Sequence, residues 1–140
     1  MANEARVFAE GTSTSLVRYF TVANGTALSK GWLMIAPTGG TRTAIPHATS
    51  ADVGSLGFTV QSKDANDGVV SIGLQRGGVV VAIADSVVQT GDVVMAGTTA
   101  NRLKRITGAA LSYQGMQSVV GRALEDAAVG GAFKVALTLM

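Results

Sequence analysis

The strongest constraint in this sequence is that its two halves repeat one order of apolar runs and glycine-containing turns. In the first half the runs are 30–35, 42–45, 53–60 and 69–74. In the second half they are 90–95, 102–106, 119–124 and 133–137. The halves match at an offset of 60 residues early on, as between Gly31 and Gly91, and a few more late. One loop insertion explains the change, so the sequence predicts a small unit used twice.

The runs themselves favour β-strands. They are short and rich in valine and other apolar residues, and they are separated by turn signals such as Asn24-Gly25 and Asp67-Gly68. These signals recur at intervals of about 8–12 residues, which is typical of an all-β sandwich or barrel. Two stretches with helical character, 50–53 and 125–129, are each about one turn long and too short to form stable helices alone.

Composition predicts a structural protein whose surface is largely covered by partners. Hydrophobic residues make up 47% of the chain and charged residues 14%, with 18 glycines. Free soluble domains normally carry about 25% charged residues. The net charge of +2 is too small for a nucleic-acid-binding footprint.

Other classes of protein are also disfavoured. The absence of cysteine removes disulfides and thiolate metal sites. The longest apolar run, residues 79–84, is too short to span a membrane. The polar start of the chain does not resemble a signal peptide, so we expect synthesis in the host cytoplasm.

No group of residues predicts an active site. His47 lies in a loop without a nearby acidic or nucleophilic residue, and we expect it at the surface. Residues 64–68 resemble the start of a calcium loop, but Gln75 stands where such a loop needs a glutamate, so a β-turn is favoured. The basic cluster Arg102, Lys104 and Arg105 lacks interleaved aromatics and indicates a solvated face or an acidic protein partner. We expect no enzyme activity, no cofactor and no metal.

Residues at alternate positions of the strongest strands define the expected core. Side chains on one face of a strand recur every second residue. The expected core residues are Trp32, Phe58, Val93, Leu124, Val135 and Leu137.

Several segments together resemble a known family. The most specific is the ending 120–137, which begins Val-Gly-Arg-Ala-Leu-Glu and continues through Gly130-Gly131 to Phe133-Lys134-Val135. Residues 28–33, 56–60 and 90–94 complete the pattern. These segments resemble the small capsid decoration, or cement, proteins of tailed bacteriophages, and the similarity covers roughly residues 16–139.

The resemblance implies a fold and a role. It implies a small antiparallel β-barrel or tulip-like body, residues 16–140, preceded by an extended arm, residues 1–15. It further implies a homotrimer on the outer surface of the virion head that stabilises contacts between major capsid protein subunits, with neither nucleic acid nor membrane as a partner.

The arm carries the expected contacts with the capsid or a neighbouring subunit. It is polar apart from residues 7–9, so we expect it to be held on its own subunit or on a neighbour. Val7 and Phe8 would anchor a short strand added to an exposed sheet edge on a neighbour. Arg6 and Arg18 would meet acidic capsid residues.

Two other interpretations stay open. One is a host-binding phage fibre or adhesin domain, which would present exposed aromatic residues for sugar stacking. The other is a lipoyl or biotinyl carrier domain, because residues 90–97 resemble a strand and turn of those domains. The four lysines lack the hairpin context of a modified lysine, although Lys63 lies near a turn.

Overall fold

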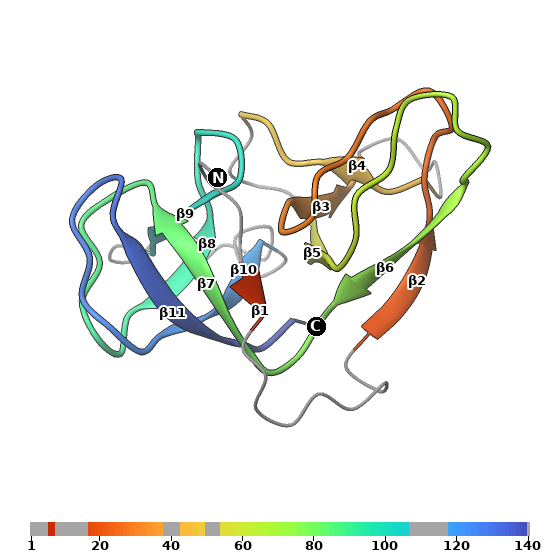
Figure 1. Cartoon of the computed structure of the whole chain (residues 1–140). Helices are drawn as coiled ribbons and strands as arrows, with labels where there is room; N and C mark the ends of the chain where they lie inside the picture. Colours follow the sequence, from red (N-terminus) through yellow and green to blue (C-terminus); the bar gives the residue numbers. More distant parts are fainter. Residues whose placement is uncertain (1–5, 8–16, 38–42, 50–53, 107–117, 140) are drawn as a thin grey trace.

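Each half of the repeat folds into a sheet with the same order of strands. The computed structural model describes residues 6–7, 17–37, 43–49, 54–106 and 118–139. The first half contains β2 (Val17–Thr21), β3 (Leu33–Ala36), β4 (Ile45–Pro46), β5 (Gly54–Thr59) and β6 (Ser71–Gln75). The second half contains β7 (Val79–Ala84), β8 (Val93–Ala96), β9 (Arg102–Arg105), β10 (Val119–Ala123) and β11 (Ala132–Leu137). The orders are β2-β6-β5-β3-β4 and β7-β11-β10-β8-β9, and the halves lie side by side (Figure 1).

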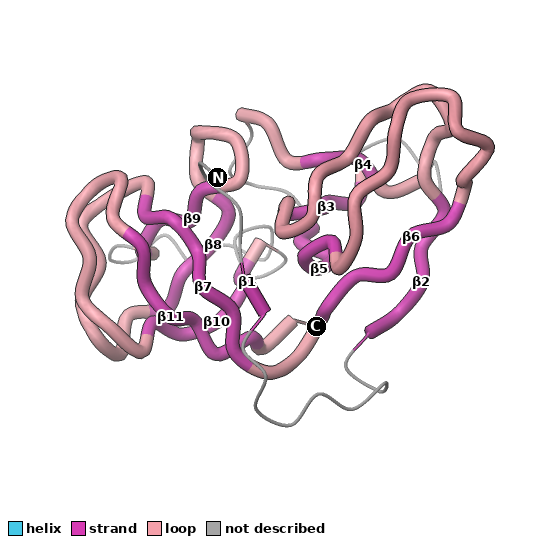
Figure 2. The backbone as a smooth tube through the Cα atoms, viewed as in Figure 1, coloured by secondary structure: helices cyan, strands magenta, loops and turns pink. Residues whose placement is uncertain are grey.

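The described residues form strands, turns and loops and contain no helix (Figure 2). The predicted all-β class is therefore confirmed. Among these residues, no helix has the length and apolarity that a membrane crossing requires.

The sheet of the second half closes into a ring, and an isolated bridge connects the corresponding edges of the first-half sheet. In the second half, β7 pairs in parallel with β9, with Ile83 opposite Arg102 and Ala84 opposite Leu103. In the first half, a parallel bridge joins Val22 to Ala44 at the same place. The sheets are consistent with the predicted small β-barrel-like body, and the one in the second half closes into a ring of strands.

The pairing registers confirm the duplication residue by residue. An antiparallel bridge joins Leu28 to Lys63 in the first half, and Val88 to Ala127 in the second. The offsets are 60 residues for the first partner and 64 for the second. The Ile106 N–H donates to Val93 O just as the His47 N–H donates to Leu33 O, so Ile106 is equivalent to His47. The extra residues of the second half therefore fall after Ile106 and before Gly121, the equivalent of Gly57. The offset also differs elsewhere, at 62 residues between β2 and β7 and 61 between β6 and β11, so the prediction that a single insertion explains the change is wrong.

A glycine in the middle of one strand of each half allows the sheet to bend. Gly57 has φ 153°, and a Cβ there would lie 2.6 Å from the carbonyl oxygen of Gln75. At the equivalent Gly121, a Cβ would collide with the backbone of Ala136. Register shifts occur beside both glycines, between β3 and β5 and between β10 and β8. Glycine at such bulges lets the backbones approach closely.

The halves are joined by a shared hydrophobic core. The larger cluster is built from the strands of the second half together with Leu33, Ile35 and Phe58 of the first. Met34 points the other way, into a smaller cluster inside the first half, which also includes Ile72 and Leu74. Successive side chains of β3 therefore point alternately into the two clusters, one on each face of the strand.

The expected core residues have different environments. Phe58, Val135 and Leu137 are buried in the larger cluster, and the half-buried Trp32 packs against the smaller one. Val93 is half-buried. The expectation for Leu124 is wrong, because this side chain is 44% exposed. It follows the buried Ala123 at the end of β10, so alternation directs it outward.

Candidate functional site

A set of buried polar contacts lies between the halves, in a place the sequence did not indicate. The Leu33 N–H donates to Asn101 Oδ1 (2.9 Å), and the Ser55 hydroxyl donates to the Ser118 carbonyl (3.1 Å). Asn101 has φ 60°, a left-handed conformation that asparagine tolerates better than most residues. These contacts, with those of His47, are called the joint below. Each connects a residue of the first half to one of the second.

His47 belongs to the joint and is 1% exposed, so the expectation of a surface histidine is wrong. Its Nε2 lies 2.8 Å from the Gly97 carbonyl, and its Nδ1 lies 3.2 Å from the Asn101 N–H. A carbonyl accepts and an N–H donates, so Nε2 carries the proton and Nδ1 is the acceptor. His47 therefore acts as a neutral bridge between two backbone groups of the second half. Its partners lie 50 and 54 residues away in sequence, so no local pattern could indicate them.

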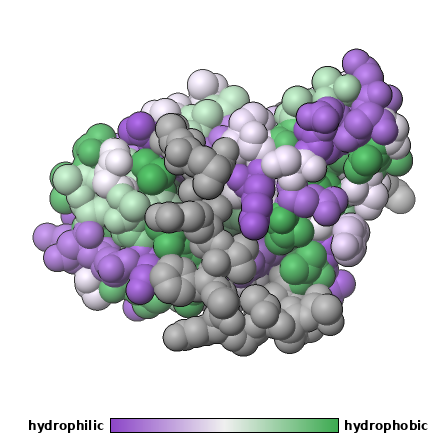
Figure 3. Space-filling model, viewed as in Figure 1, coloured by the Kyte–Doolittle hydropathy of each residue, from purple (hydrophilic) through white to green (hydrophobic). Residues whose placement is uncertain are grey.

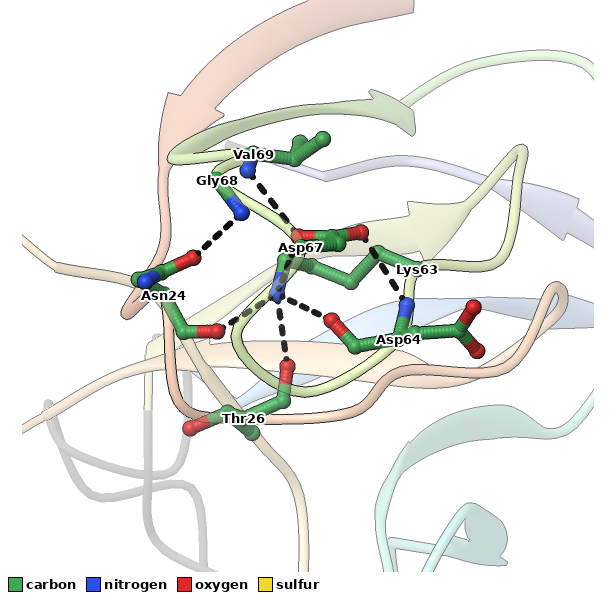
Figure 4. Close-up of polar contacts among 7 residues, drawn as sticks. All are labelled: Asn24, Thr26, Lys63, Asp64, Asp67, Gly68 and Val69. Carbon is green, nitrogen blue, oxygen red and sulfur yellow. Dashed lines mark hydrogen bonds and ion pairs between the residues drawn. The ribbon is translucent and has the colours of Figure 1, made fainter.

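A second buried polar group is the ammonium of Lys63 in the first half (Figure 4). Its Nζ donates to the carbonyls of Asn24, Thr26 and Asp64, each at 3.0 Å, and lies 3.3 Å from Asp67 Oδ1. The Lys63 side chain is 1% exposed. It ties two loops together at the far tip of the first half, where hydrophilic residues gather (Figure 3).

The chemistry of this tip explains why residues 64–68 form a turn instead of a cation site. The N–H groups of Val69 and Asp64 donate to the Asp67 carboxylate. The Val69 N–H and then the ammonium of Lys63 hold the pKa of Asp67 below its ordinary value. The Lys63 ammonium thus supplies the positive charge beside the Asp67 carboxylate that a bound cation would otherwise supply. No group of three or more potential metal-ligating side chains occurs among the described residues.

The second half replaces this arrangement with a simpler one. Ala127 occupies the position of Lys63, and the loop from Ala127 to β11 is shorter than the loop from Lys63 to β6. Thr90 donates through its N–H (2.7 Å) and hydroxyl (2.9 Å) to Asp126 Oδ1, where the first half has the Lys30 N–H donating to the Ser62 hydroxyl. The two bonds from Thr90 lower the pKa of Asp126.

The N-terminal strand lies on the chain's own second half. β1 (Arg6–Val7) pairs antiparallel with β7, with Arg6 opposite Val81 and Val7 opposite Val80. The segment is thus held on its own subunit, one of the two placements expected, and its contact with the capsid or a neighbouring subunit stays a prediction. Phe8 lies outside the described residues. Arg18 is exposed on β2. The structure does not bring it together with Arg6, because β1 and β2 lie at the edges of different sheets.

The basic cluster lies along β9. Arg102 and Lys104 are half-buried, and Arg105 is exposed. Lys104 and Arg105 border a shallow hollow that Ser86 and Val87 complete. Several large apolar side chains are also exposed elsewhere: Tyr19, Ile45, Val69, Val70, Val87, Leu124 and Val129. These features are suited to binding other molecules, and none of them assembles a nucleophile with a base.

Comparisons with known proteins show a similarity to a solved phage structure. No protein-family model matches the sequence, and no curated protein matches it. Among solved structures, the chain is similar to the N base of head fiber gp8.5 in bacteriophage phi29, with a TM-score of 0.57. The similarity covers 87% of this chain and 94% of that one, at 16% sequence identity. The two proteins therefore share a fold that includes both halves.

Proposed function

We propose that this chain is a structural protein of a tailed-phage virion that binds the outer surface of the head as a decoration protein. In this role it stabilises contacts between neighbouring major capsid protein subunits and assembles as a homotrimer. The observation that carries the proposal is the fold shared, over both halves, with the base of a phage head fiber. The sequence resemblance to decoration proteins supports the same assignment independently.

The chemistry of the surface fits a binding protein. The chain has few charges, and large apolar side chains are exposed on both halves. Contacts repeated at many copies on a shell gain avidity without requiring a strong single site. A decoration protein needs a rigid body, which the joint and the shared core supply.

A reconstitution experiment tests the proposal. Heads of the encoding phage that lack this protein are mixed with the purified chain and sedimented, and the bound amount is measured. We expect saturable binding at a fixed number of copies per head, and slower release of DNA on heating. A chain that stays in the supernatant at all concentrations would contradict the proposal.

A second candidate is the base of a head fiber, and the similarity to the phi29 structure favours it. Such a base would also bind the head, but it would carry a projecting fiber and leave the heat stability of the head unchanged. The same experiment therefore separates the two functions. The carrier-domain interpretation is disfavoured, because Lys63, the lysine next to a turn, is buried and bonded to three carbonyls.

A further inference from the structure

The duplication shows what one sheet edge of the first half is built to accept. β2 pairs with β6 at five positions, and β7 pairs with β11 at five matching positions. Arg18 and Tyr19 of β2 therefore correspond to Val80 and Val81 of β7. In the second half these two residues pair with β1, on the edge of β7 that also carries β9.

On the equivalent edge of β2, two positions have no backbone partner among the described residues. The Val22 N–H donates to Val70 on the β6 side. The backbone groups of successive residues in a strand point alternately to its two sides. The N–H and C=O groups of Val17, Tyr19 and Thr21 therefore point away from β6, toward the outer edge of β2. Thr21 O accepts the Ala44 N–H there. No strand among the described residues pairs with Val17 or Tyr19 on this edge.

The side chains along this edge are also exposed. Tyr19 is 70% exposed, and its ring lies over Gly73 on the outer face of the sheet. Arg18 is exposed, and no hydrogen bond or ion pair joins its side chain to another described residue. On the same face as Arg18, the Arg76 guanidinium lies 5.8 Å from the centre of the Phe20 ring and adds a second positive charge.

We propose that the outer edge of β2 binds an extended segment of another protein as an added antiparallel strand. The segment carries an acidic residue opposite Arg18, preceded by a β-branched or aromatic residue opposite Tyr19. Opposite charges and aromatic or β-branched pairs are the favoured cross-strand neighbours. The chain's own N-terminal strand cannot fill this edge while it occupies β7. The occupant therefore comes from a different protein, and main-chain pairing supplies most of the affinity.

An NMR titration tests the proposal on the complete chain, independently of any phage head. The ¹⁵N-labelled protein is titrated to millimolar concentration with the synthetic peptide Thr-Val-Thr-Val-Glu-Val-Thr. We expect the amide signals of Val17 and Tyr19 to shift and their hydrogen exchange to slow, while exchange at Phe20, already bonded to β6, stays unchanged. A peptide with lysine in place of glutamate should bind at least about threefold more weakly.

A charge reversal in the protein provides the matched test. Arg18→Glu should invert the preference between the two peptides. Arg122→Glu makes the same change of net charge at an exposed position of β10, which is paired on both sides, and should keep the preference of the unaltered chain. Equal binding of the two peptides by the unaltered chain would overturn the assigned chemistry.

Two other results would overturn the proposed occupant. Absence of any change at Val17 and Tyr19 at millimolar peptide would show that the edge accepts no strand. Protection of the Tyr19 amide that rises with protein concentration in the absence of peptide would show that a second copy of the chain occupies the edge instead.

Discussion

Replacing Asn101 separates two contributions that the joint makes to stability. The side chain accepts a hydrogen bond from the Leu33 N–H, and the backbone has φ 60°. Asn101→Gly removes the hydrogen bond and leaves the backbone unstrained. Asn101→Ala removes the bond and also places a Cβ in a left-handed conformation.

Asn66, in the first half of the chain, provides a matched control for Asn101. It has φ 59°, nearly the same conformation, but it is exposed, and no hydrogen bond joins its side chain to another described residue. Asn66→Gly and Asn66→Ala therefore measure the backbone effects alone.

The magnitudes follow from burial. Leu33 is fully buried, so its N–H cannot turn to water when the Asn101 oxygen is lost. An unsatisfied buried donor costs about 1–3 kcal/mol, and we expect Asn101→Gly to lower the free energy of unfolding by that much more than Asn66→Gly. The alanine variants should each lose about 1 kcal/mol beyond the corresponding glycine variants, because left-handed backbone is strained for alanine.

Urea unfolding, followed by tryptophan fluorescence, measures all four variants. The slope of the transition reports whether the two halves still unfold together. If Asn101→Gly and Asn66→Gly agree within about 0.5 kcal/mol, the Asn101–Leu33 bond does not hold the halves together, and the account of the joint is wrong.

Three other predictions follow from the core, the Lys63 cluster and the acidic side chains. Phe58→Ala should cost about 3–5 kcal/mol in unfolding free energy, while Leu124→Ala should stay within about 0.5 kcal/mol; comparable losses would refute the assignment of Leu124 to the surface. Lys63→Met should lower the free energy of unfolding by about 3–5 kcal/mol, because it leaves Asp67 and three carbonyls without the ammonium. The control Lys30→Met, at an exposed lysine, should change it little. Equal effects of the two variants would contradict the buried contacts of Lys63. The hydrogen bonds from Thr90 hold the pKa of folded Asp126 below 3.8. The contribution of Asp126 to stability is therefore present above about pH 4 and is lost as the pH falls through the lowered pKa. Asp126→Asn should flatten the dependence of the unfolding free energy on pH in that range, and an unchanged dependence would refute the role of the Thr90 bonds.

Much of the fold could be predicted because the residues that determine it act locally. Gly31 and Gly91 form turns at positive φ, and Gly57 and Gly121 permit the close backbone approach at the bulges. Their spacing revealed the duplication. Leu124 was misplaced because the bulge beside Gly121 interrupts the alternation, so that Ala123 is buried and Leu124 faces solvent.

The joint and the strand edges could not be predicted, because they depend on tertiary contacts. His47 becomes a buried bridge through Gly97 and Asn101, which only the packing of the halves brings near it. A strand as short as Arg6–Val7 does not indicate in the sequence which sheet edge it will join. The edge of β2, unpaired at Val17 and Tyr19 among the residues the structure describes, became recognisable only once β1 was seen on the equivalent edge of β7.

Electron cryomicroscopy of heads with and without the bound chain tests the proposed function most directly. The account predicts added density with threefold symmetry on the outer surface of the shell, bridging neighbouring major capsid protein subunits. Each third of that density should fit both barrel-like halves. Identical maps with and without the chain, or density confined to the tail, would contradict it.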